Sequence, residues 1–202
     1  MSHSRDGVPP APVSNRVRAL EDALSAKQLV PDDYFENTAA HTEKEFDSRN
    51  GAKAVAKAWV DPAYRVRLLA DGAAASAELG FNTMNSEHLV VLENTPTLHN
   101  VIVCTQCSCT AWSMLGLPPD WYKSPEYRAR IVREPRALLG EMGLDLRAET
   151  SVRVWDTSGG TRYFVLPLRP QGTEGWSEER LASIVSREAM IGVARVEVPP
   201  RR

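Results

Sequence analysis

Residues 101–109 read Val-Ile-Val-Cys-Thr-Gln-Cys-Ser-Cys, and this stretch decides how the rest of the chain is interpreted. Its β-branched residues predict a buried strand that leads directly into a loop holding all three cysteines of the protein. An odd number of cysteines packed this tightly is a poor disulfide framework. In a reducing compartment such a cluster is more often metal-binding or redox-active. The stretch therefore predicts a chemically functional loop at the end of a strand.

Common cysteine sites fit this spacing poorly. Zinc takes four ligands, usually in separated pairs, so a zinc site here would have to be closed by His99 or by another chain. An iron–sulfur cluster also takes four thiolates. A dithiol redox pair needs only Cys104 and Cys107 and usually stands at a helix start, which leaves Cys109 unused. Three reduced structural cysteines are the simplest alternative, and the crowding argues against them.

One octahedral ion uses the spacing more fully. Cys107 and Cys109 lie two residues apart, so both thiolates can bind while the backbone nitrogens of Ser108 and Cys109 come within reach. Two sulfurs and two deprotonated nitrogens would form a square plane, with Cys104 as an axial sulfur and the sixth position open. Such strong donors suit a low-spin trivalent ion better than zinc or magnesium.

The overall composition is that of an ordinary soluble protein. The chain has 202 residues, of which 43% are hydrophobic and 25% charged, and its net charge is -2. This balance gives no reason to expect binding to nucleic acid or to a membrane surface. No apolar stretch is long enough to span a bilayer. Because Met1–Asn15 is polar and lacks an apolar signal core, we expect a cytoplasmic location.

The pattern along the chain predicts an α+β fold with an N-terminal helical arm. We expect a disordered lead-in at 1–13, a helical arm that docks on a partner at 14–50, and a metal-binding catalytic domain at 51–202. Ser14 is expected to cap the first helix. Further helices are predicted over 51–60, from Asp61-Pro62 to about Ala70, after Ser124-Pro125, after Glu134-Pro135 and after Ser177. Strands are predicted at 89–92 and 101–103, in a hairpin of 152–155 and 162–165 turned by Ser158-Gly159-Gly160, and at 190–198.

The cysteine loop resembles the metal-binding motif of nitrile hydratase α subunits, which is commonly Cys-Thr-Leu-Cys-Ser-Cys in the cobalt type. The iron type usually has Ser at the position of Thr105. The resemblance covers about three quarters of the chain. It includes the segments 49–53, 58–59, 87–95, 99–101, 115–124, 133–136, 152–162, 169–170, 172–177 and 191–193.

The resemblance implies a layered α-β-β-α domain and a function. A member of this family hydrates a nitrile to an amide at a trivalent metal, expected here to be Co³⁺ with iron as the alternative. Cys104 would remain a thiolate, Cys107 would be a sulfinic acid and Cys109 a sulfenic acid. The sulfenate oxygen of Cys109 is then a candidate nucleophile, with water as its competitor. A β subunit would close the site and an activator protein would load the metal.

Several residues depart from the family pattern near the expected site. Gln106 replaces the usual Leu, Asn85 and Ser86 stand where Gln-Gly is common, and Ser113 follows Trp112 where Pro is common. Trp112 is a candidate pocket wall or an ordinary core residue. Together these changes indicate an altered pocket or a specialised substrate.

Other functions remain open at this point. The metal subunit of thiocyanate hydrolase carries the same motif, and a toyocamycin-type hydratase acting on a nucleoside nitrile is a further member of the family. A protein outside the enzyme class could bind a metal or sense redox state through the same cysteines.

Overall fold

The computed structural model describes residues 12–81, 88–107 and 109–199. It divides into two compact units, Met1–Lys44 and Glu45–Arg202. The predicted end of the arm at residue 50 falls inside a helix of the second unit. The lead-in predicted for residues 1–13 lies almost wholly outside the described residues.

Among the described residues of the first unit, two helices form, α1 (Val13–Ala26) and α2 (Tyr34–Glu45), the last residue of α2 belonging to the second unit. The prediction that Ser14 caps α1 is wrong, because the helix begins one residue earlier, after Pro12, and has no side-chain cap. None of the residues of α1 is buried, and Val13, Val17 and Leu20 are 71%, 47% and 61% exposed. The apolar stripe of α1 therefore has no core of its own.

The second unit begins with three helices in quick succession, α3 (Ser48–Val60), α4 (Pro62–Ala70) and α5 (Gly72–Ala77). Each is preceded by an aspartate whose carboxylate accepts from the first-turn backbone: Asp47, Asp61 and Asp71. Small residues fill the buried face of α3, which lets α10 and α6 pack closely against it. The helices predicted at 51–60 and 62–70 are confirmed.

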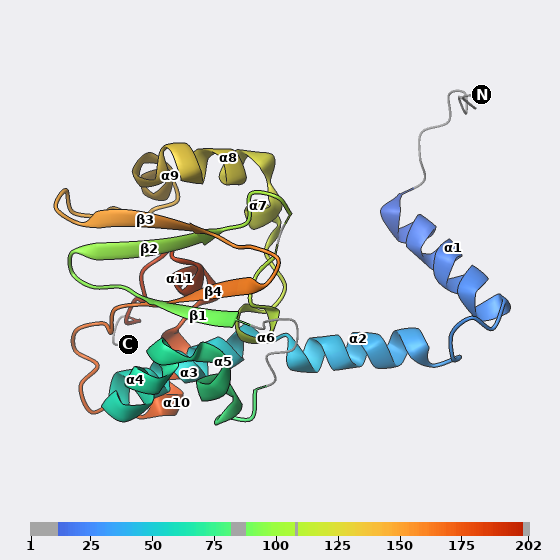
Figure 1. The fold of residues 1–202 in the computed structure, drawn as a ribbon, viewed down its shortest axis with the longest axis horizontal. Helices are drawn as coiled ribbons and strands as arrows, with labels where there is room; N and C mark the ends of the chain where they lie inside the picture. The colour runs from blue at the N-terminus through green and yellow to red at the C-terminus, as the bar shows by residue number, and fades with distance from the viewer. Residues whose placement is uncertain (1–11, 82–87, 108, 200–202) are drawn as a thin grey trace. The chain divides into compact units, whose positions relative to one another are not determined.

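In the described part of the chain, four strands form two parallel pairs between the helices (Figure 1). β1 (His88–Glu93) pairs with β4 (Thr161–Leu166), and β2 (Leu98–Val103) pairs with β3 (Ser151–Asp156). In Figure 1, α8 and α9 lie on one side of the strands, and α3, α4 and α10 lie on the other. This arrangement agrees with the expected α+β fold of layered α-β-β-α type.

The hairpin predicted around Ser158-Gly159-Gly160 is wrong. β3 and β4 do reverse direction there, but they belong to different pairs. A turn signal fixes where the chain reverses and says nothing about which strand each arm joins. The consequence for the site is a register in which Val103, the last residue of β2, lies opposite Asp156.

The remaining elements are helical. They are α6 (Trp112–Leu115), α7 (Asp120–Lys123), α8 (Pro125–Arg133), α9 (Pro135–Glu141), α10 (Glu178–Ile184) and α11 (Arg187–Ile191). The helices predicted after Ser124, Glu134 and Ser177 are confirmed, whereas α6, α7 and α11 were not predicted. The strand predicted at 190–198 is wrong, because α11 runs to Ile191. Gly192 then caps the helix with a φ of +92°, and its lack of a Cβ lets the chain approach the backbone of Asn100.

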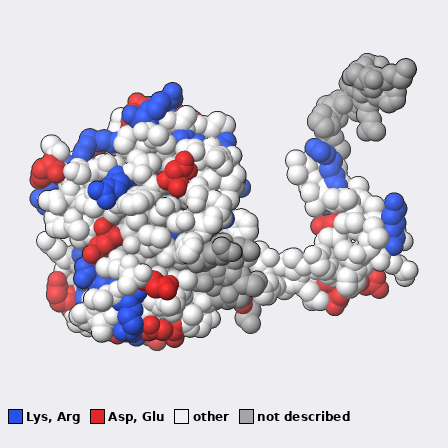
Figure 2. Space-filling view, in the orientation of Figure 1, with Lys and Arg blue, Asp and Glu red and all other residues white. Residues whose placement is uncertain are grey.

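Charged side chains of both signs are interspersed over the face shown in Figure 2. Among the described helices, none is long and apolar enough to cross a membrane.

Candidate metal centre

The three cysteines converge at the end of β2. Their sulfur atoms all lie within 4.8 Å of one another. The Sγ atoms of Cys104 and Cys107 are 3.2 Å apart, and those of Cys107 and Cys109 are 2.8 Å apart. These separations exceed the bond length of a disulfide, and none of the three cysteines forms one. The cluster presents three soft donors to one point, which is the arrangement a single metal ion needs.

The burial of the cysteines is graded. Cys104 is 2% exposed, Cys109 is partly buried and Cys107 is exposed. The backbone N–H of Cys107 donates to the Cys104 sulfur at 3.3 Å, which folds the loop back on itself. One edge of the cluster is thus anchored in the core while the other faces outward.

In the absence of a cation, the surroundings of Cys109 disfavour ionisation of its thiol. Burial, followed by the neighbouring Cys107 thiol, raises the pKa of Cys109 to about 11. A bound cation reverses this preference and deprotonates a coordinating thiol. The donor set therefore fits a bound metal cation.

Asp156 anchors the loop from the neighbouring strand. Its carboxylate accepts from the backbone N–H of Thr105 at 3.0 Å and from the Thr105 hydroxyl at 2.6 Å. The β2–β3 register brings this carboxylate to the first residues of the loop. Sequence reasoning missed Asp156 because the wrong hairpin paired β3 with β4.

Side chains of α7 and α8 hold three backbone carbonyls of the strand end and the loop. The Tyr127 hydroxyl donates to the carbonyl of Ile102 at 2.8 Å, and the Tyr122 hydroxyl donates to that of Cys109 at 3.3 Å. Arg128 donates through Nη1 to the carbonyl of Cys107 at 3.3 Å. Tyr122 lies in segment 115–124, which resembles the family, and this resemblance is the one signal in the sequence that could have identified it. Nothing in the sequence pointed to Arg128.

The other predicted site residues occupy different surroundings. Gln106 is exposed beside Cys107. Trp112 begins α6, and its ring centroid lies 5.5 Å from that of Phe46. The Trp112 indole N–H is buried with no acceptor among the described residues. Ser108 and Asn85, which were also predicted, lie outside the described residues.

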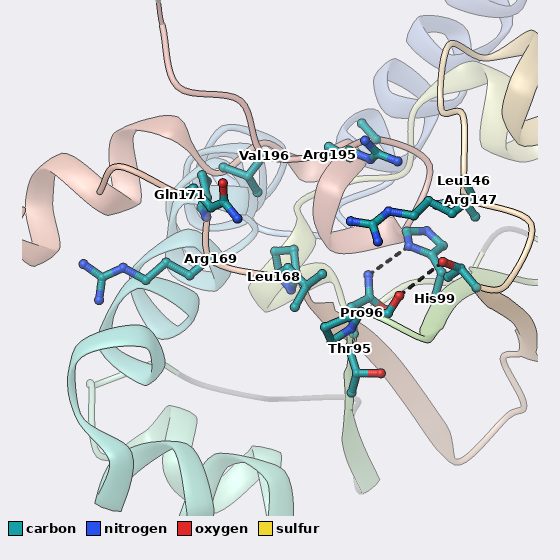
Figure 3. A pocket seen from close by; sticks show the side chains of 15 residues that line it. Thr95, Pro96, His99, Leu146, Arg147, Leu168, Arg169, Gln171, Arg195 and Val196 are labelled. Atoms are coloured by element: carbon teal, nitrogen blue, oxygen red, sulfur yellow. Dashed lines mark hydrogen bonds between the residues drawn. The ribbon is translucent and has the colours of Figure 1, made fainter. Parts of the chain in front are cut away.

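The opposite end of β2 carries a separate cavity of about 540 Å³ (Figure 3). His99, Arg147 and Arg195 are among its lining residues. The His99 Nε2–H donates to the carbonyl of Gly192 at 2.7 Å, and Nδ1 accepts from the Asn94 amide at 3.2 Å. Burial, with the charge of Arg195, lowers the pKa of His99. His99 is thus a satisfied, neutral residue of the interior and does not join the cysteines.

Comparison with known proteins places the chain in one family. Residues 11–194 match the family described as nitrile hydratase, alpha chain. The low-molecular weight cobalt-containing nitrile hydratase subunit alpha of Rhodococcus rhodochrous is 47% identical over 189 residues, covering 94% of this chain and 91% of that one. Thiocyanate hydrolase subunit gamma of Thiobacillus thioparus is 47% identical over 154 residues, 71% of this chain and 63% of that one.

A solved structure shows the same architecture. A double mutant of the Fe-type nitrile hydratase from Comamonas testosteroni Ni1 is 50% identical, with a TM-score of 0.88 over 95% of this chain and 94% of that one. With its cysteine cluster at the end of β2 and similarity over nearly its full length, the chain belongs to the nitrile hydratase α-chain family.

Proposed function

We propose that this chain is the metal-bearing α subunit of a nitrile hydratase and hydrates a nitrile to its amide. The observation that carries the proposal is the convergence of Cys104, Cys107 and Cys109 within 4.8 Å in a chain of this family. The reaction adds one water across the carbon–nitrogen triple bond and releases no second product.

The proposed ligands come from one short loop. The sulfurs of Cys104, Cys107 and Cys109 and the backbone nitrogens of Ser108 and Cys109 would hold the ion. When bound, a low-spin trivalent ion supplies Lewis acidity that polarises a nitrile or acidifies water. Burial of Cys104 and its N–H bond from Cys107 support its role as the fixed, inward ligand.

The two outward cysteines are proposed to act in oxidised form. One dioxygen molecule converts the Cys107 thiolate to a sulfinate by adding both of its oxygen atoms. A second dioxygen molecule converts the Cys109 thiolates of two chains to sulfenates, one oxygen atom on each. The Cys109 oxygen would then attack the nitrile carbon, and water would return the oxygen that leaves with the amide. The competing proposal is direct attack by a water molecule held at the sulfur oxygens.

A β subunit is proposed to complete the site. Thr105, Gln106 and Cys107 are all exposed, so this chain alone leaves the outer edge of the loop open to water. The unburied stripe of α1 supports a docking role for residues 14–50. We expect the isolated chain to be inactive, and we propose that an activator protein loads the metal in the cytoplasm.

Cobalt is proposed as the metal, with iron as the alternative. The cobalt-containing relative and the Fe-type structure are similarly close to this chain, at 47% and 50% identity. Thr105 favours cobalt by resemblance. Its hydroxyl binds Asp156 at 2.6 Å, a contact that serine could also make, so this hydrogen bond does not explain the metal preference.

Thiocyanate hydrolysis is the second candidate, supported by the 47% identity to a thiocyanate hydrolase subunit. A nucleoside nitrile, as in a toyocamycin-type hydratase, is a further candidate substrate because Gln106 is exposed beside Cys107. The amide of Gln106 could hydrogen-bond a polar substrate where the usual leucine could not.

The test is a substrate comparison on the assembled complex. The chain, co-produced with its β subunit in medium containing cobalt, is assayed on an aliphatic nitrile, a heteroaromatic nitrile and thiocyanate. Amide formation from a nitrile supports the proposal, and thiocyanate consumption alone selects the second candidate. Turnover of none of these by a cobalt-loaded complex contradicts both. Amide formation that survives Cys109→Ala would exclude the sulfenate as nucleophile.

A further inference from the structure

Arg128 occupies a distinctive place on α8. It follows Tyr127, whose hydroxyl donates a hydrogen bond to the carbonyl of Ile102 near the end of β2. Arg128 itself donates to the carbonyl of Cys107 in the cysteine loop, at 3.3 Å. Helix α8 thus holds the strand through one residue and the cysteine loop through the next. Because Arg128 is itself partly buried, its guanidinium is fixed more firmly than an exposed arginine would be.

The carbonyl that Arg128 binds is central to the proposed ligand set. It belongs to the peptide joining Cys107 to Ser108, between one sulfur ligand and one nitrogen ligand. Thiolates and deprotonated peptide nitrogens bring more negative charge than a trivalent ion neutralises. A cationic donor on this carbonyl oxygen therefore stabilises the occupied loop more than a neutral donor would.

The charge of Arg128 is uncompensated among the described residues, in contrast to Arg130 two positions later. Arg130 forms ion pairs with Glu126, Glu134 and Glu141 at 3.3, 2.6 and 2.6 Å. Within residues 12–81, 88–107 and 109–199, no carboxylate forms an ion pair with Arg128. On the same helix, surface carboxylates therefore neutralise Arg130, whereas the guanidinium of Arg128 donates to the cysteine loop.

Arg128 also has unused hydrogen-bonding capacity. Its Nε is buried and has no acceptor in the described part of the chain. A buried guanidinium N–H without an acceptor is costly, so such groups are normally found with a partner. An oxygen atom of an oxidised cysteine in the loop, or an oxygen atom of the β subunit, would accept a hydrogen bond from this Nε–H.

We propose that Arg128 is a positioning residue of the metal centre: it fixes the Cys107–Ser108 peptide and offsets the negative charge of the ligand set. This inference rests on the function proposed above. It assigns to the metal-bearing chain itself a cation that acts on the backbone of the loop and not on the substrate.

The test compares charge, hydrogen bonding and bulk at this position. Arg128→Lys keeps the charge, Arg128→Gln keeps an N–H donor without charge, and Arg128→Met keeps most of the bulk. Arg133→Met is the matched control, because Arg133 is exposed on the same helix and forms no ion pair or hydrogen bond within the described residues. Each variant is produced with the β subunit and cobalt.

Three measurements follow for each complex: cobalt per chain after a chelator challenge, the mass of the 104–109 peptide, and the sulfur-to-cobalt absorption band. We expect chelator-resistant cobalt to fall about 10-fold or more in Arg128→Met and Arg128→Gln, as for other residues that orient ligands. The absorption band should shift in these variants, Arg128→Lys should recover most of the cobalt, and Arg133→Met should match the wild type.

Wild-type cobalt retention and an unshifted band in Arg128→Gln or Arg128→Met would overturn the proposal. An equal loss in Arg128→Lys and Arg128→Met, together with a lowered melting temperature of the metal-free protein, would also overturn it by showing a packing role. Should Arg128→Met fail to fold, Arg128→Gln decides. A wild-type complex that holds no cobalt would contradict the proposed function and this inference with it, whereas cobalt-loaded, active variants contradict only the inference.

Discussion

The two ends of β2 are built for opposite purposes. At its start, His99 is buried and both of its ring nitrogens are hydrogen-bonded, to Asn94 and to Gly192. At its end, three thiols crowd together, one of them exposed, in a loop held by side chains from β3, α7 and α8. The first arrangement is complete within the chain, and the second is proposed to be completed by the metal ion it binds. The comparison teaches that a buried, fully hydrogen-bonded residue contributes stability, whereas a close cluster of like, partly exposed ionisable groups is a candidate functional site.

The largest expected effect comes from removing the inward ligand. Cys104→Ala should abolish cobalt binding and with it all nitrile hydration by the complex, because the buried one of the three proposed sulfur ligands is lost. Elemental analysis and an amide-formation assay measure this. Near-normal cobalt content in Cys104→Ala would show that the cysteine cluster is not the metal site.

The anchor on β3 should have the next largest effect. Asp156→Ala removes both hydrogen bonds to Thr105, so we expect cobalt affinity or kcat to fall about 10- to 100-fold. Asp156→Asn, which keeps one carbonyl acceptor, should lose less. Steady-state kinetics and competition with a chelator measure the two quantities, and equal loss in both variants would indicate that the charge matters more than the hydrogen bonds.

The start of β2 should respond in stability and not in metal binding. His99→Ala leaves Gly192 O and the Asn94 amide without their partner, which should lower the free energy of unfolding by about 1–3 kcal/mol. Denaturant unfolding measures this. The cobalt content of the folded complex should equal that of the wild type. A loss of cobalt at unchanged stability would contradict the claim that the start of β2 serves stability and only its end serves metal binding.

The same histidine predicts a pH dependence of smaller size. Burial lowers the pKa of His99 below its unfolded value of 6.5, so the unfolded chain binds the proton more readily. The histidine should therefore cost nothing at pH 7 and reduce stability as the pH falls below about 6.5. Unfolding curves between pH 5 and 8 should show a shallower acid decline in His99→Asn than in the wild type, and parallel curves would refute the assignment.

The smallest effect is expected from Gln106→Leu, which restores the usual residue of the family. Because Gln106 is exposed, stability and cobalt content should stay within error of the wild type. We expect KM to rise for a polar heteroaromatic nitrile, by up to about 10-fold for one lost hydrogen bond, and to change little for an aliphatic nitrile. An equal change for both substrates would place Gln106 away from the substrate.

The sequence predicted local features well and long-range pairing poorly. The cysteine spacing, the strand before it and the Asp61-Pro62 start of α4 depend on neighbouring residues, so they could be recognised directly. The parallel β2–β3 pairing joins residues about 50 positions apart, and no local signal specifies it. Asp156 and Arg128 were missed for that reason, since each reaches the loop only through tertiary structure.

The most direct test of the central claim is elemental analysis combined with mass spectrometry of the 104–109 peptide from the assembled complex. The account predicts one cobalt ion per chain and a peptide heavier by three oxygen atoms, two on Cys107 and one on Cys109. Zinc bound to three unmodified thiols would contradict it.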